Sequence, residues 1–439
     1  MTTTEHSFDF SARAMRVAME RVWKTLCRDI GERRAGTDEE RRAAEFIAGE
    51  LAACGIENVR LEVFPCTSLR EAFAEVHELS GKRWRRVEAA PLVGAPPTPG
   101  RRAIDAELVW LELPEEAHRL TPGSLDGRVL AWFGPLPTDP AVHRRLIAAR
   151  PSAVIHVDER LPFSWVKNDG VYPFWTRRHG MPPTLTVPYA DAWRWRRDGV
   201  KRVRVRVRIE QVAAPSRNVI AELPGADSTL PAIALTAHHD TQCGNPGADD
   251  NASGVVCLLA LARTLAPMRL RRTVRFLSFG TEEQLSVGAD HHVRKHRVAP
   301  ADTGLVVNFD SVSSPLGHFG LSVAGGESLA RHAVRALAKR GLAVQLQREI
   351  TPFADQFPFN RAGVPSLYFF RSNFSGGRWQ HHSRYDSLDN VSLAPISRML
   401  DAAAPLIAEL AERRSWPFSL TLPANQRHAA RKLGRDLFG

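Results

Sequence analysis

Residues 232–254 constrain the fold of this chain more than any other segment. The segment opens with a short, mostly apolar run, 232–237, which has the length and composition of a buried β-strand. The run stops at His238 and Asp240, and a loop rich in Gly, Pro and Asn leads to the acidic residues 249–250. Apolar residues at helical spacing follow, and an acidic pair ahead of them is typical of a helix N-terminus. We predict strand, loop and helix, with imidazole and carboxylate groups crowded where the strand ends.

Strand-like and helix-like runs alternate from Asn218 onward. The strand-like runs are 219–223, 232–237, 274–279, 305–309, 321–323 and 366–370. The helix-like runs are 252–265, 287–296, 328–340 and 394–412. This alternation predicts an α/β domain with a mixed, largely parallel sheet flanked by helices.

The first half of the chain has a different texture. Residues 8–50 predict two helices, and the second opens with Thr37 and Glu40 at the spacing of a capping box. Between 67 and 212, short β-rich runs separated by Pro and Gly predict an inserted, mostly β domain with one helix near 140–149. We therefore divide the chain into four parts. They are an N-terminal helical segment (1–66), an inserted domain (67–212), the α/β domain (213–415) and a basic tail (416–439).

Composition narrows the classes of function. The 439 residues are 44% hydrophobic and 24% charged, as in ordinary globular proteins, and no apolar run approaches the ~20 residues that span a bilayer. The N-terminus lacks the pattern of a signal peptide, so we expect a cytoplasmic protein with no membrane partner. The net charge of +11 raises nucleic-acid binding as an alternative. In residues 203–209, however, Arg alternates with apolar residues at the period of a half-buried strand, and we expect no nucleic-acid partner.

Four strand-like runs of the α/β domain end at side chains that bind metals. Their ends lead to His238-His239-Asp240, to Glu282-Glu283, to Asp310, and to a Gly-rich loop that carries His381-His382 and then Asp386. In open α/β sheets the carboxyl ends of the strands border the binding crevice, so we expect these loops to converge. A single acidic residue after a strand is a common helix cap, but four such ends in one domain indicate a metal site.

The available side chains match what two metal ions sharing one carboxylate need. The candidate ligands are two histidines and three carboxylates: His238, His382, Asp250, Glu283 and Asp310. Mixed nitrogen and oxygen ligation with an open position for water fits Zn²⁺. Neighbours such as Glu282 and Glu283 point in different directions, so one can bind metal while the other faces the water as a base. Asp240 is placed to accept the imidazole N–H of His238.

Five motifs taken together resemble those of the co-catalytic zinc aminopeptidases, relatives of glutamate carboxypeptidase and glutaminyl cyclase. They are A-H-H-D-T from Ala237, P-G-A-D-D-N-A-S-G from Pro246, F-G-T-E-E from Phe279, N-F-D-S from Asn308 and H-S-R-Y-D-S from His382. The resemblance covers roughly residues 216–410, and residues 34–37 resemble the family's N-terminal segment. It implies a zinc-exopeptidase fold, and a protease-associated-like domain for the insert at 67–212.

The resemblance also implies a role for each candidate residue. The metal ligands would be His238 and Asp310 for one zinc, His382 and Glu283 for the other, and Asp250 as the bridge. Glu282 would be the general base, and Asp240 would orient His238. In this register His239 and His381 are not ligands, and Gln356 stands where His is frequent in the family.

The resemblance thus implies a zinc-dependent exopeptidase with two zinc ions per chain, most simply an aminopeptidase acting on peptides. A carboxypeptidase is the first alternative, with a cation for the substrate's terminal carboxylate among Arg361, Arg371, Arg378 and Arg384. A cyclotransferase and a non-catalytic basic interaction protein are further alternatives.

One pair of histidines falls outside these motifs. His292 and His296 lie four residues apart on a predicted helix, a spacing that can bind a metal. Because no carboxylate partner is evident nearby in the sequence, we interpret the pair as part of a solvated helix face.

Overall fold

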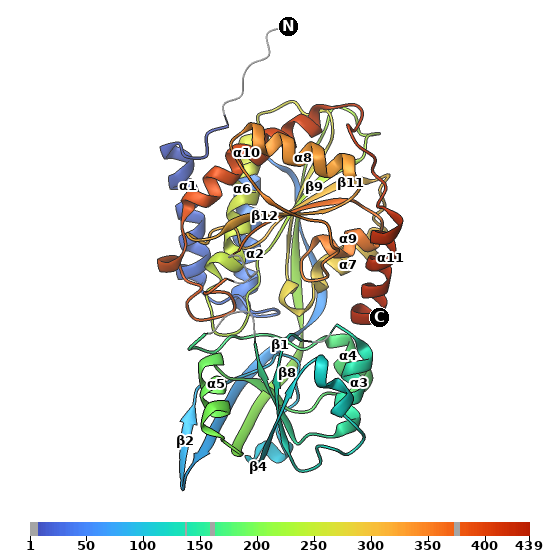
Figure 1. Ribbon diagram of the computed structural model, residues 1–439. Helices are drawn as coiled ribbons and strands as arrows, with labels where there is room; N and C mark the ends of the chain where they lie inside the picture. Colours follow the sequence, from blue (N-terminus) through green and yellow to red (C-terminus); the bar gives the residue numbers. More distant parts are fainter. Residues whose placement is uncertain (1–7, 137, 159–162, 373–377) are drawn as a thin grey trace.

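Two long strands connect the upper and lower parts of the molecule (Figure 1). The computed structural model describes residues 8–136, 138–158, 163–372 and 378–439. The connecting strands are β1 (Glu57–Ser80) and β8 (Arg202–Leu223), which pair antiparallel from Glu57 opposite Glu222 to Glu78 opposite Val203. Strand β1 runs from the upper part into the lower part and β8 runs back, so one sheet passes through the whole molecule.

The remaining elements follow in chain order. The other strands are β2 (Arg83–Val87), β3 (Ala90–Pro91), β4 (Ile104–Glu112), β5 (Val129–Phe133), β6 (Ala153–Val157), β7 (Thr184–Thr186), β9 (Ala232–His238), β10 (Val274–Phe279), β11 (Thr303–Phe309), β12 (His318–Ala324), β13 (Gln345–Gln347) and β14 (Ser366–Ser372). The α-helices are α1 (Arg13–Lys24), α2 (Asp38–Ala53), α3 (Pro140–Ala149), α4 (Pro173–His179), α5 (Tyr189–Asp198), α6 (Ser253–Leu265), α7 (Val287–Lys295), α8 (Glu327–Lys339), α9 (Gln356–Arg361), α10 (Leu393–Glu412) and α11 (Ala424–Leu433).

The upper part is an α/β layered structure, which confirms the predicted fold class. Its strands lie in the order β13-β12-β14-β11-β9-β10-β8, and β9 pairs parallel with both β10 and β11. Strands β9 and β11 are buried along their whole length because helices cover both faces of the sheet. Helices α1, α2, α6, α8 and α10 share one hydrophobic core with one face, and α7 and α9 share another with the opposite face (Figure 1).

The lower part contains its own apolar clusters around β4, β5, β6 and β7, which form a parallel ladder next to β8. Helix α3 lies where the sequence predicts it, whereas α4 and α5 are not predicted. Helix α4 begins at Pro173 and has only seven residues, too few for a clear helical period, and α5 follows Pro188. Strands β1 and β8 cross the expected boundaries at 66/67 and 212/213, and the division into domains and the likeness of the insert to a protease-associated domain stay predictions.

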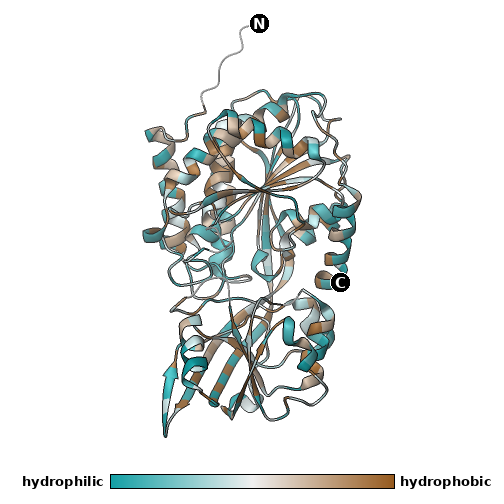
Figure 2. Ribbon diagram, viewed as in Figure 1, coloured by the Kyte–Doolittle hydropathy of each residue, from teal (hydrophilic) through white to brown (hydrophobic). Residues whose placement is uncertain are grey.

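The alternating arginines of β8 form the expected half-buried strand. Val203, Val205 and Val207 are fully buried, while Arg202 and Arg204 face outward and pair with Asp105. Figure 2 shows this alternation of hydrophilic and hydrophobic residues along the strands of the lower part. The positive charge of this run is therefore partly neutralised on the sheet surface.

The N-terminus of α2 follows the capping prediction in one half only. The Thr37 side chain accepts a hydrogen bond from the backbone N of Glu40 at 3.2 Å, as a cap requires. The Glu40 carboxylate, however, accepts from the backbone N of Gly36 at 2.7 Å and from Ser216 Oγ at 2.5 Å. Burial raises the pKa of Glu40 to about 8. Glu40 thus connects the N-terminus of α2 to Ser216 on β8 and does not complete a capping box.

A search of the described residues finds no helix with the length and apolar character needed to cross a membrane.

Candidate metal centre

The loops after four neighbouring strands meet at one edge of the upper sheet. His238 is the last residue of β9, Asp310 follows β11, Glu283 follows β10, and His382 lies in the loop after β14. Asp250 lies in the turn that leads from β9 into α6. Because β9, β10, β11 and β14 run parallel, their carboxyl ends lie side by side, and the structure brings these five side chains together.

Asp250 lies between two histidines. Its Oδ1 is 3.1 Å from His238 Nε2, and its Oδ2 is 3.4 Å from His382 Nε2. Asp310 Oδ2 lies 3.8 Å from His238 Nε2, and Glu283 Oε2 lies 3.2 Å from His382 Nε2. Each histidine therefore has a carboxylate of its own, and the two oxygens of Asp250 face one pair each.

The donor set fits two divalent metal ions. Ligand atoms on a tetrahedral Zn²⁺ with bonds of 2.0–2.1 Å are about 3.3 Å apart, close to the separations measured here. His238 is 1% exposed, and its Nε2 has no hydrogen-bond partner among the described residues, although it points at two carboxylates. Burial raises the pKa of both Glu282 and Glu283. Repulsion from the neighbouring carboxylates, Asp310 for Glu282 and Asp250 for Glu283, raises it as well. A cation between them removes this repulsion.

Glu282 and Glu283 point in different directions, as expected for neighbours in a turn. Glu283 faces His382, whereas Glu282 Oε2 lies 3.9 Å from His238 Nε2. The other oxygen of Glu282 accepts from Ser286 Oγ at 3.1 Å. The Glu282 carboxyl group therefore borders the space between the two pairs.

Asp240 connects two of the converging loops. His238 Nδ1 faces it, 3.2 Å from the backbone oxygen of Asp240 and 3.5 Å from Oδ1. The Asp240 carboxylate accepts the backbone N–H groups of Glu282 at 2.9 Å and Glu283 at 3.2 Å. A single side chain therefore holds the turn that carries both glutamates and lies against the imidazole of His238.

Asp386 and His381, which the sequence analysis gives no role at the centre, both contact Asp250. The Asp386 carboxylate accepts from the backbone N of Asp249 at 2.6 Å and of Asp250 at 3.0 Å, which orients the bridging residue. His381 Nδ1 lies 2.8 Å from Asp250 Oδ2, and its ring stacks on that of His382. The adjacency of His381 to His382 is a visible signal of this contact, whereas nothing in the spacing indicates that Asp386 reaches back to Asp250.

The Arg33 side chain donates hydrogen bonds to the backbone of the loop between β9 and α6. It is fully buried, and its guanidinium donates to five backbone oxygens. The acceptors are the carbonyl groups of His239, Leu26, Gly31, Pro246 and Gly247. The side chain therefore satisfies backbone groups of the loop that ends at Asp250.

Replacing Arg33 should destabilise the protein strongly. Arg33→Met removes a donor from five carbonyl groups; those of Leu26 and Gly247 keep a backbone donor, and the other three lose their partner at about 1–3 kcal/mol each. We expect the free energy of unfolding to fall by at least about 3 kcal/mol, with Arg33→Lys intermediate because an ammonium group has three donors. Urea unfolding followed by circular dichroism measures both variants. An unchanged midpoint for Arg33→Met would contradict this account.

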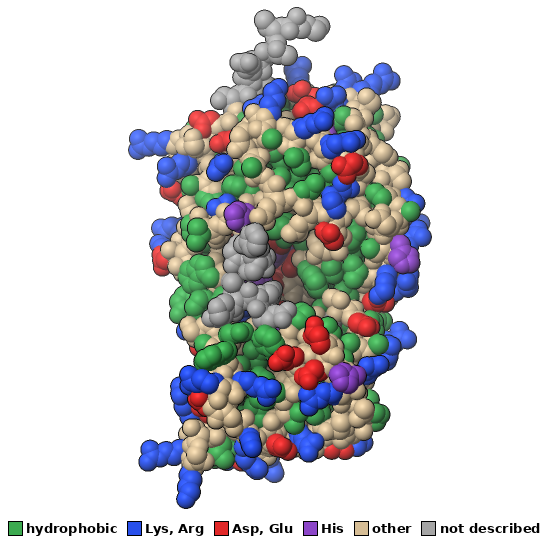
Figure 3. All heavy atoms as spheres, viewed as in Figure 1, with side chains coloured by type: hydrophobic (Ala, Val, Ile, Leu, Met, Phe, Trp, Pro, Cys, Tyr) green, Lys and Arg blue, Asp and Glu red, His purple; other side chains and the backbone are tan. Residues whose placement is uncertain are grey.

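A cavity of about 470 Å³ opens above the metal-ligand candidates. Figure 3 shows a hollow in the middle of this face, with acidic side chains inside it and hydrophobic side chains at its rim. Tyr172 from the lower part and Phe353 from the upper part line it together, with ring centroids 6.4 Å apart. Gln356 lies outside the lining, where it accepts from Asn308 Nδ2 at 3.1 Å. The cavity therefore lies between the two parts of the molecule.

The four arginines weighed for a carboxypeptidase lie in different places. Arg378 lines the cavity, 3.7 Å from Asp250 Oδ2. The other three make contacts elsewhere: Arg361 with Asp290, Arg371 with the backbone oxygen of Ser314, and Arg384 with Glu88.

The interpretation of His292 and His296 as a solvated face is wrong. His292 is 6% exposed, and both imidazoles contact the carboxylate of Glu62 on β1. That carboxylate lies 230 positions away in sequence, so no local pattern reveals it.

The description "Peptidase family M28" belongs to the family model that matches residues 218–407. The matched region is less than half of the chain, and it is similar to the members of that family.

Two relatives and one solved structure illustrate the similarity. The chain is 24% identical over 194 residues to aminopeptidase YwaD of Bacillus subtilis, covering 42% of each chain. It is 26% identical over 298 residues to carboxypeptidase Q of Bos taurus, covering 64% of this chain and 62% of the relative. The chain thus spans less than two thirds of the length of these relatives. The structure of a zinc aminopeptidase from Bacillus subtilis superposes with a TM-score of 0.70 at 20% identity, covering 95% of this chain and 99% of that one, so the two share a fold.

Proposed function

We propose that the protein is a zinc-dependent aminopeptidase that removes the N-terminal residue of peptides with a centre of two zinc ions per chain. The observation that carries this proposal is the position of Asp250, whose two oxygens face two separate histidine–carboxylate pairs. The match of residues 218–407 to the family M28 model and the similarity to an aminopeptidase and to a zinc aminopeptidase support it.

The residues take distinct roles in this proposal. The ligands are His238 and Asp310 for one ion, His382 and Glu283 for the other, and Asp250 for both. Bound zinc supplies Lewis-acid polarisation of the scissile carbonyl and lowers the pKa of water.

Glu282 acts as the general base in the proposed reaction. It accepts a proton from the attacking water at its carboxylate and delivers it to the leaving nitrogen, so that the peptide bond breaks as an amine departs. Burial raises the pKa of Glu282, which makes its carboxylate a stronger base. Asp240 keeps His238 and the turn of Glu282 in register through the contacts described above.

The charges of the cavity favour the amino end of a peptide. Its lining includes Asp169 beside the carboxylates of the centre, and Asp158, which pairs with Lys167 at 3.1 Å. An ammonium group is attracted to this surface, whereas a terminal carboxylate would meet repulsion from it. Tyr172 and Phe353 provide apolar area for the first side chain of the substrate.

Blocking the N-terminus should abolish cleavage. We expect the zinc-loaded enzyme to hydrolyse leucine p-nitroanilide and to act at least about 100-fold more slowly on its N-acetyl form, because a site built for an amine leaves its groups unpaired without one. Steady-state rates on the two compounds measure the ratio. Equal rates would contradict an aminopeptidase.

A carboxypeptidase is the second candidate, because Arg378 lines the cavity and carboxypeptidase Q is among the relatives. An N-acetylated dipeptide with a free C-terminus distinguishes the two. If wild type releases the C-terminal residue of this dipeptide and Arg378→Gln does not, the carboxypeptidase is favoured.

The proposal includes a cytoplasmic location and no nucleic-acid partner. All five cysteines, which the structure describes, are free, as is usual in reducing compartments. The arginines at the lower end of β8 are paired with carboxylates rather than gathered into a basic patch.

A further inference from the structure

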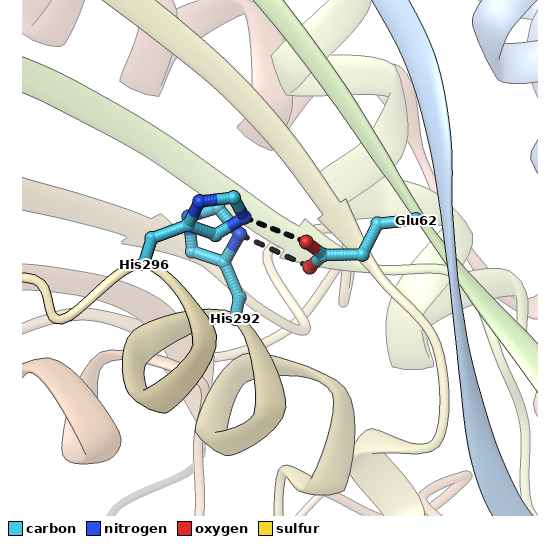
Figure 4. Close-up of side chains that lie close together, drawn as sticks. All are labelled: Glu62, His292 and His296. Atoms are coloured by element: carbon cyan, nitrogen blue, oxygen red, sulfur yellow. Dashed lines mark hydrogen bonds and ion pairs between the residues drawn. The ribbon is translucent and has the colours of Figure 1, made fainter.

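A second cluster of metal-binding side chains lies outside the cavity. Glu62 comes from β1, and His292 and His296 come from successive turns of the α7 region, so that both imidazoles point at one carboxylate (Figure 4). The three candidate ligand atoms lie within 4.8 Å of one another. None of the three is among the described residues that line the cavity. We propose that Glu62, His292 and His296 form an additional binding site for a divalent transition-metal ion such as Zn²⁺.

The distances suit a small ion. His292 Nδ1 is 3.2 Å from Glu62 Oε2, close to the edge of about 3.3 Å of a tetrahedral zinc site. His296 Nε2 is 2.6 Å from Glu62 Oε1, and this pair has to open by several tenths of an ångström. His296 is well placed to move because it lies just after the last residue of α7 and its side chain is 37% exposed. Two nitrogens and one carboxylate leave the fourth position for water.

The surroundings favour a transition metal over Ca²⁺ or Mg²⁺. Imidazole is a preferred ligand of zinc, nickel and copper, whereas hard cations select oxygen donors. His292 directs its Nδ1 at the carboxylate of Glu62. Its ring lies among Phe279 and Phe359, which keep that side of the cluster dry.

Two polar groups already contact the carboxylate and help to decide how the site works. Asn218 Nδ2 donates to Glu62 Oε2 at 3.2 Å, which fixes the orientation of the carboxylate as outer partners of metal ligands do. Lys295 Nζ lies 3.3 Å from Glu62 Oε1, but its side chain is 50% exposed and can turn into solvent when a cation arrives. Arg275, which pairs with Asp302 and Glu222, adds further positive charge near His292. The site is therefore selective for ions that bind imidazole strongly.

An ion at this site would restrain the turn that carries Glu282 and Glu283. Helix α7 begins at Val287, directly after the turn that carries Glu282 and Glu283. Joining α7 to β1 restrains this turn from its far end. The additional site does not depend on the proposed peptidase function, because its ligands are separate from those of the cavity.

Zinc content after reloading tests the proposal. The full chain is stripped with a chelator, reloaded with zinc, freed of excess by gel filtration and analysed for metal per chain. We expect wild type to retain one zinc more than His296→Gln, whatever number the catalytic centre holds. His291→Gln is the matched control, because His291 lies on the same helix but stacks on Phe64 instead of reaching Glu62. It should retain the wild-type number.

A measurement on wild type alone avoids any effect of substitution on folding. Zinc should protect His296 from modification by diethyl pyrocarbonate, read by mass spectrometry, while His291 reacts as before. Equal zinc content in wild type and His296→Gln, or equal modification of His296 with and without zinc, would overturn the proposal. The rate on leucine p-nitroanilide tests the peptidase separately.

Discussion

Glu282→Gln should lower kcat by about 10²–10⁴-fold while the zinc content of the protein stays the same. The amide keeps the size of the side chain but cannot accept a proton from water. Because Glu282 Oε2 lies 3.9 Å from His238 Nε2, at the border of the two histidine–carboxylate pairs, the loss falls on the chemical step rather than on binding. Steady-state kinetics on aminoacyl p-nitroanilides, with metal analysis of the same samples, measure both quantities.

Two further glutamates serve as controls for this substitution. Glu283→Gln should lose metal as well as activity, because its carboxylate faces His382 at 3.2 Å. Glu349→Gln changes an exposed glutamate and should behave as wild type. Activity of Glu282→Gln equal to that of wild type would end the assignment of Glu282 as the base.

Asp250→Asn should weaken the binding of both zinc ions, by at least about 100-fold, and with it remove activity. Loss of an outer partner of a metal ligand alone costs 10–100-fold in affinity, and Asp250 is the shared ligand in our proposal. One substitution therefore affects two sites at once, whereas Asp310→Asn should affect the ion beside His238 first. Competition with a chromogenic chelator measures both affinities.

The control for this substitution is Asp389→Asn, at a surface aspartate whose side chain is 84% exposed. It should bind zinc as wild type does. Full zinc content in Asp250→Asn would show that the two pairs do not share this carboxylate, and the proposed centre would have to be abandoned.

Local patterns predicted the elements that carry the centre. The run at 232–237 became β9, the apolar residues after Asp250 became α6, and the parallel order of β9, β10 and β11 follows from the alternation of strands and helices. Side chains at strand ends could be grouped in advance because parallel strands share an edge. The closeness of Asp250 to both histidines is consistent with that grouping, and the role of each ligand stays a prediction.

Contacts between distant segments escaped the same reasoning. Arg33 donates to carbonyl groups of a loop more than 200 residues later, and Asp386 holds the backbone of Asp250 from the opposite direction. The capping pattern at Thr37 was half right, because the Glu40 carboxylate accepts from Gly36 and Ser216 instead of from the backbone N of Thr37. Each of these partners lies on another element, and spacing along the chain carries no information about it.

Hydrophobic period and the residue types at strand ends were enough to predict an α/β domain with candidate metal ligands at one edge of its sheet, because such patterns depend on neighbours within a few positions. Packing of remote elements settled everything that needed a partner: the direction of each carboxylate, the cavity between the two parts, and the joining of His292 and His296 to Glu62. Burial makes an unpaired charge costly, so these groups found one another only when the chain closed around them.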